Sequence, residues 1–135
     1  MRLNSLSLSN YRKYVYEEIN FPDGLIGIIG PNGAGKSTLM ESIAWVLYGH
    51  PAARTQKEQI KRHDSSRLDV CQAVLSFEIN GTSYQITRQM KGKDFTSNVS
   101  IFACKTKMAD GSKACLEFIT GLLGMDREAF FTSFF

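Results

Sequence analysis

The run from Gly30 to Ser37 constrains this chain more than any other segment. Its letters, GPNGAGKS, fit the pattern G-x-x-x-x-G-K-[ST] at every fixed position. An apolar run over residues 25–29 precedes it, and apolar residues at helical spacing follow it over residues 36–48. We therefore predict a buried strand, then a tight phosphate-binding loop, then a helix that ends at Gly49.

Each residue type in this run has a chemical reason. Glycines let the backbone curl so that successive N–H groups face one anion, and the positive end of the following helix also attracts phosphate. A lysine charge suits the β and γ phosphates, and the Ser37 hydroxyl is the expected Mg²⁺ ligand. The sequence therefore predicts binding of ATP with Mg²⁺, and the predicted binding residues are Asn32, Gly33, Ala34, Gly35, Lys36, Ser37 and Thr38.

Hydrolysis is a separate question, because it needs a carboxylate that holds the metal and orients water. No convincing aliphatic strand ending in Asp or Glu follows the loop, since the nearest stretch, residues 74–78, is interrupted by Ser76. Adjacent glycines are also absent, so the Ser-Gly-Gly type of motif that completes some sites from a partner subunit is missing. We predict no catalytic residue within these residues, and weak ATP binding with little turnover from this chain alone.

The rest of the chain contains a coarse pattern of strands and helices. Asn80-Gly81 lies between two alternating segments and predicts a β-hairpin, because both residues tolerate the positive φ of a tight turn. Asp126 is a candidate cap for a further helix. The other expected elements are a strand over residues 1–8, a polar loop over 10–16, a strand over 18–21, a basic surface loop over 52–67, a strand over 98–105 and a helix over 113–123 with Leu116, Ile119, Leu122 and Leu123 on one face.

Composition sets the broad class. The chain has 135 residues, of which 43% are hydrophobic and 21% charged, as in an ordinary globular domain. No apolar stretch is long enough for a membrane span, and the amino terminus lacks a signal-peptide core, so we expect a cytoplasmic protein with no membrane contact. The net charge of +3 is too small to argue for nucleic acid by itself. The three cysteines, in no C-x-x-C spacing, are expected to be thiols.

Several segments together resemble a known family. The pattern Leu-x-Leu-x-Asn-Tyr-Arg over residues 6–12, the run over 28–38 and the helix end Leu47-Tyr48-Gly49 are similar to the amino-terminal half of an SMC-like ATPase head. The match is closest to the SbcC-type double-strand-break repair ATPases. The hairpin and residues 130–135 resemble that family's strand pair and the helix before its glutamine loop. The resemblance implies an α/β fold: the amino-terminal lobe of an ABC-type P-loop ATPase head, with a mixed sheet, a β-hairpin and a central P-loop helix.

The resemblance also implies how such a lobe works. Residues 1–135 would form one lobe, ending before the glutamine loop and the coiled coil, and the aromatic run Phe130, Phe131, Phe134 and Phe135 agrees with a natural sequence that continues. A carboxy-terminal lobe would bring the signature motif and the catalytic glutamate. Two heads would sandwich two ATP molecules, coupling nucleotide state to DNA and to an SbcD-type nuclease. Arg12 would contact the phosphates, and Arg62 and Asp64 would approach the nucleotide from the side.

Two alternatives stay open at this point. The same loop occurs in the nucleotide-binding subunits of ABC transporters, and the chain could also be a docking module that holds nucleotide weakly without hydrolysis. Without the resemblance, Arg12 is an exposed basic residue in a loop. The basic residues of 54–67, with Lys91 and Lys93, are either solvated surface or contacts to a DNA backbone. Tyr11, Tyr14 and Tyr16 either stack on a base or pack against the sheet.

Overall fold

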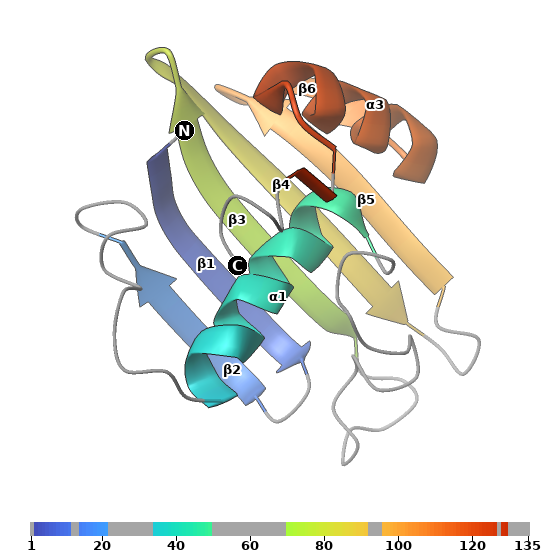
Figure 1. The fold of residues 1–135 in the computed structure, drawn as a ribbon. Helices are drawn as coiled ribbons and strands as arrows, with labels where there is room; N and C mark the ends of the chain where they lie inside the picture. The colour runs from blue at the N-terminus through green and yellow to red at the C-terminus, as the bar shows by residue number, and fades with distance from the viewer. Residues whose placement is uncertain are drawn as a thin grey trace.

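The computed structural model describes residues 2–11, 14–21, 34–49, 70–91, 96–126 and 128–129. They form one six-stranded sheet in the order β2-β1-β3-β4-β5-β6, with α1 and α3 against one of its faces (Figure 1). The elements are β1 (Arg2–Tyr11), β2 (Tyr14–Asn20), α1 (Ala34–Tyr48), β3 (Cys71–Ile79), β4 (Thr82–Lys91), β5 (Thr96–Ala103), β6 (Thr106–Asp110) and α3 (Ser112–Leu123).

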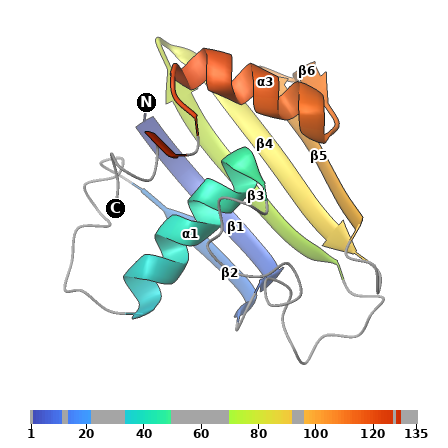
Figure 2. The same cartoon turned by 45° about the vertical axis from the view of Figure 1, so that its right-hand side comes forward.

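All neighbouring strands of this described sheet are antiparallel. The α/β class expected from the sequence is confirmed. The expected mixed sheet is not seen among the described strands, because every pair of neighbours is antiparallel. The strand predicted over residues 25–29 and the surface loop predicted over 52–67 lie outside the described residues. Figure 2 shows α1 and α3 side by side on the same face of this sheet.

The β3–β4 hairpin confirms the prediction from Asn80-Gly81. Asn80 has φ 51° and Gly81 has φ 81°, so both central residues lie in the left-handed region that a two-residue hairpin turn needs. Ile79 then pairs with Thr82, and the register continues to Cys71 opposite Met90. Alternate residues of both strands face the helices, as the period of two requires.

A second tight hairpin was not predicted. The strand expected over residues 98–105 ends at Ala103, and Cys104 (φ 48°) and Lys105 (φ 75°) turn the chain into β6. Neither residue type is a usual occupant of that conformation, so the sequence carried no turn signal here. The polar loop expected over 10–16 was also wrong in extent, because β1 runs to Tyr11 and β2 begins at Tyr14.

β1 changes which residues it buries along its length. Leu3 and Leu6 are both buried although they are three apart, because the register shifts between Leu3 and Ser5 at a bulge. Leu8 and Tyr11 are also three apart and buried, and Asn10 between them has φ 51°. Strict alternation therefore fails twice in β1, while four large side chains still reach the core.

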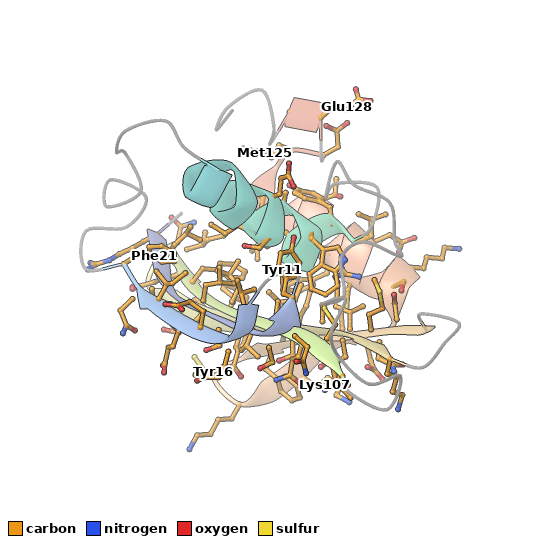
Figure 3. All side chains as sticks on the ribbon, turned by 90° about the horizontal axis from the view of Figure 1, so that it is seen from below. Tyr11, Tyr16, Phe21, Lys107, Met125 and Glu128 are labelled. Atoms are coloured by element: carbon orange, nitrogen blue, oxygen red, sulfur yellow. The ribbon has the colours of Figure 1, made fainter. Side chains whose placement is uncertain are left out.

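The core lies between the sheet and the helices. All residues of α1 from Ser42 onward are buried, and Trp45 packs against the Tyr11 ring with centroids 5.4 Å apart. Figure 3 shows Tyr11 and Phe21 on the helix side of the sheet, with Tyr16 and Lys107 on the opposite side. Tyr11 therefore packs inside the protein, whereas the Tyr16 side chain is 61% exposed.

α3 covers β5 and β6 next to α1. Its buried residues are Cys115 and Ile119, whereas Leu116, which the sequence placed on the apolar face, is 43% exposed. The helix ends at Gly124 in a left-handed conformation, whose N–H bonds the carbonyl of Thr120. The Asp126 carboxylate then accepts the amide N–H of Ala129 at 2.9 Å, which confirms Asp126 as a capping residue.

Two glycine-to-alanine changes should act in opposite directions. Gly49 has φ 95°, and a Cβ there would lie 3.3 Å from Arg88 Nη1, so Gly49→Ala should lower the free energy of unfolding by about 1–2 kcal/mol. Gly121 lies exposed within α3 with nothing within 4 Å of its Cβ position, so Gly121→Ala should raise it by about 0.5–1 kcal/mol. Urea denaturation measures both, and equal stability of the two variants would contradict this account of Gly49.

Candidate functional site

The predicted phosphate-binding run ends at the start of α1. Ala34, Gly35, Lys36, Ser37 and Thr38 are the first five residues of this helix, so the motif's Gly-Lys-Ser lies in its first turn. The first turn of any helix leaves backbone N–H groups without partners inside the helix, and these groups point outward along its axis. The structure therefore brings five of the predicted binding residues to one helix terminus.

Five other predicted residues stay untested. Asn32, Gly33, Arg12, Arg62 and Asp64 lie outside the described residues. Only the backbone is described for the first residues of α1, so the roles of the Lys36 and Ser37 side chains remain predictions.

The chemistry of the α1 terminus suits an anion. The first turn carries no acidic residue, so no carboxylate of this turn competes with a negative ligand for the backbone N–H groups that have no partner within the helix. The helix dipole adds the equivalent of about half a positive charge at this end. Gly35 has no side chain and lets a ligand approach the backbone closely, and Lys36 adds a full positive charge. These residues fit a phosphate group, and Ser37 supplies a hydroxyl oxygen of the kind that Mg²⁺ prefers.

At the other end of α1, two buried polar side chains were not predicted as functional. Arg88 on β4 donates from Nε to the carbonyl of Val46 at 3.1 Å and is only 4% exposed. The Tyr48 hydroxyl donates to the carbonyl of Met125 at 3.0 Å. One signal was available: Arg88 stands between Ile86 and Met90 at a core-facing position of an alternating strand.

The environments of these groups shift their pKa values. Burial lowers the pKa of Arg88 to about 10, which leaves the guanidinium positively charged at neutral pH. Burial, followed by the negative charge of Asp126, raises the pKa of Tyr48 to about 12, so its hydroxyl stays a donor. Burial also raises the pKa of the Cys115 thiol, against the opposing effect of Arg88. Both polar contacts of the α1 carboxyl end are therefore stable at physiological pH.

Other candidates for a second centre are the cysteines and the other possible metal ligands among the described residues. Cys71 and Cys115 are buried thiols and Cys104 is an exposed one, as the sequence predicted. Within the described ranges, no group of three or more His, Cys, Asp or Glu residues is placed to hold a metal ion. None of the helices in that part of the chain has the length and apolar character that a membrane span requires.

Comparison with known proteins decides the family. A family model described as "AAA domain" matches residues 5–133, which is nearly the whole chain. This chain belongs to that family. One relative is the DNA double-strand break repair Rad50 ATPase of Archaeoglobus fulgidus. It is 33% identical to this chain over 99 residues, which cover 73% of this chain and 11% of the relative. The protein of the same name from Methanocaldococcus jannaschii is 30% identical over 139 residues, covering 100% of this chain and 13% of the relative.

A solved structure supports the same assignment at the level of the fold. The SMC head domain from Thermotoga maritima superposes on this AAA domain with a TM-score of 0.51 at 22% identity, covering 80% of this chain and 39% of that one. The AAA domain is therefore an SMC-like amino-terminal lobe of the Rad50/SMC type, which confirms the resemblance seen in the sequence. It spans between a tenth and a sixth of the length of the Rad50 relatives that it matches.

Proposed function

We propose that this lobe binds ATP at the start of α1 and serves as the nucleotide-binding half of an SMC-like DNA repair ATPase. One observation carries the proposal: the last residues of a complete G-x-x-x-x-G-K-[ST] run form the first turn of a helix, as phosphate binding requires. The names of the Rad50 relatives, DNA double-strand break repair ATPases, support repair as the setting.

The residues of the run take separate roles. The backbone N–H groups from Gly33 to Ser37 hold the β and γ phosphates, and Lys36 neutralises part of their charge. The Ser37 hydroxyl is one ligand of Mg²⁺, whose charge neutralises the phosphate oxygens when it is bound. Asn32 and Thr38 donate further hydrogen bonds. Arg12 contacts the phosphates, and Arg62 and Asp64 approach the nucleotide from the side.

Hydrolysis requires groups from elsewhere. The sequence after the loop contains no convincing aliphatic strand ending in Asp or Glu, so we propose that a complementary carboxy-terminal lobe supplies the metal-binding and catalytic carboxylates. Two such heads then close over two ATP molecules. Their closure couples the nucleotide state to DNA and to an SbcD-type nuclease. The Rad50 relatives favour this setting over an ABC transporter.

Measurements of ATP turnover and DNA binding test whether hydrolysis needs groups from outside this lobe. The 135-residue chain alone is expected to bind ATP and to hydrolyse it about 10²–10⁴-fold more slowly than the complete protein, which is the usual contribution of a positioned acid–base group. The complete protein should also bind duplex DNA more tightly with ATP than without it over a salt series. Rapid Mg²⁺-dependent hydrolysis by the 135 residues alone would contradict the division of the site. DNA binding that ignores ATP would instead favour a docking module.

A further inference from the structure

The carboxyl end of α1 is held by two long-range hydrogen bonds. Arg88, 42 residues further along the chain than Val46, donates to the Val46 carbonyl at 3.1 Å. Tyr48 donates to the carbonyl of Met125, 77 residues away, at 3.0 Å. Both side chains are almost fully buried, at 4% and 5% exposure. A helix end with two buried polar side-chain contacts is defined more tightly than hydrophobic packing alone requires.

Arg88 fixes this end of α1 to the sheet. The last turn of α1 carries no basic residue of its own, so the Arg88 guanidinium from β4 supplies the positive charge that the negative end of a helix favours. The chain bends away at Gly49, whose missing Cβ would lie 3.3 Å from Arg88 Nη1. Keeping a charged group in this buried place costs desolvation free energy, which is offset here by the contact to the helix end.

Tyr48 connects the same helix end to the chain after α3. Met125 directly follows Gly124, where α3 ends, and directly precedes Asp126, which caps the next helical turn through Ala129. The Tyr48 bond therefore contacts the link between two helices (Figure 3 labels Met125). This gives a physical role to the Leu47-Tyr48-Gly49 helix end, which the phosphate-binding chemistry leaves unexplained.

α1 joins this link to the proposed nucleotide site. With 15 residues at 1.5 Å per residue, the helix is about 22 Å long and connects the two places as one continuous hydrogen-bonded element. We propose that Arg88 and Tyr48 are positioning residues: Arg88 anchors the carboxyl end of α1 on the sheet, and Tyr48 passes the effect of nucleotide binding at its amino end to the chain after Met125. This inference rests on the proposed ATP site at Ala34–Ser37.

Hydrogen exchange with and without nucleotide tests the connection. In the complete wild-type protein, the non-hydrolysable analogue adenosine 5′-(β,γ-imido)triphosphate with Mg²⁺ should slow amide exchange over residues 120–129 by about fivefold, the equilibrium effect of one neutral hydrogen bond. Tyr48→Phe keeps the ring and removes the hydroxyl that donates to Met125, so the slowing should fall below about twofold. Its affinity for the analogue should weaken by no more than about fivefold, because coupling between two sites is reciprocal.

Matched variants separate positioning from general destabilisation. Tyr16→Phe makes the same change at an exposed tyrosine on β2 and should leave the exchange of 120–129 at the wild-type value. Arg88→Lys keeps a cation that can donate to the Val46 carbonyl, so it should retain more of the nucleotide effect than Arg88→Met. If Arg88 only stabilised the fold, both Arg88 variants would be less stable than the wild type. Their amide exchange over residues 120–129 would then respond to nucleotide as the wild type does.

The outcomes distinguish this inference from the proposed function. Absence of any binding of the analogue to the wild-type protein would overturn both. Binding without a change over residues 120–129 would leave the ATP site standing and overturn the inference. A Tyr48→Phe variant that responds as strongly as the wild type would overturn it as well.

Discussion

Replacing Lys36 with methionine is expected to weaken ATP binding about 100-fold while leaving the fold intact. The lysine would contact the β and γ phosphates, and two charge-assisted hydrogen bonds of about 1.5 kcal/mol each correspond to roughly a factor of 100 in the dissociation constant. Methionine keeps the length of the stem and a high helix propensity, so α1 should still form. Calorimetric titration of the wild type and of Lys36→Met with Mg²⁺ and ATP gives the ratio directly.

Lys107→Met provides the matched control. Lys107 lies on β6 at the open face of the sheet and forms an exposed ion pair with Asp110 at 3.8 Å, which is worth little in water. This control removes the same charge from the chain and should leave ATP affinity within about twofold of the wild type, since a distant exposed charge is largely screened. Equal affinities of Lys36→Met and Lys107→Met would contradict the proposed phosphate contact.

Replacing Trp45 with alanine is expected to lower the free energy of unfolding by about 3–5 kcal/mol, the usual cost of deleting a buried tryptophan side chain. Trp45 is 1% exposed and is among the largest fully buried side chains of the described core. Its ring contacts Tyr11 at 5.4 Å with planes inclined by 45°, a contact that adds to the effect of burial alone. Urea denaturation with an unchanged m-value measures this loss.

Tyr16→Ala shows what deletion of an aromatic ring costs at the surface. Tyr16 is 61% exposed and its hydroxyl donates to the carboxylate of the nearby, exposed Glu18 at 3.3 Å, so the loss should stay within about 0.5 kcal/mol. If Trp45→Ala does not fold, Trp45→Phe should still show a smaller loss in the same direction. A Trp45→Ala variant as stable as Tyr16→Ala would mean that α1 does not pack on the sheet as described.

Local turn chemistry explains which hairpin could be predicted. Asn80-Gly81 combines two residue types that accept positive φ at low cost, so the sequence predicted the β3–β4 turn. Cys104-Lys105 adopts a similar pair of positive φ values without such residues, because pairing of β5 with β6 and packing under α3 outweigh the local preference. Tertiary contacts of this kind leave no signal in a short segment.

The two ends of α1 also differ in how well the local sequence predicts them. The motif from Gly30 to Ser37 is local and predicted a helix that starts near Lys36, and α1 begins two residues earlier, at Ala34. The contacts of the other end join residues 42 and 77 positions apart. The alternating strand pattern predicted that Arg88 faces the core. It could not predict the partner Val46, because a single sequence does not show which strand residue lies next to a distant helix end.

A crystal structure of this chain with Mg²⁺ and a non-hydrolysable ATP analogue tests the central claim most directly. The account predicts β and γ phosphate oxygens within about 2.7–3.2 Å of backbone nitrogens between Gly33 and Ser37, with Mg²⁺ on the Ser37 hydroxyl. An analogue that binds elsewhere, or a first turn of α1 without phosphate at saturating concentration, would contradict the account.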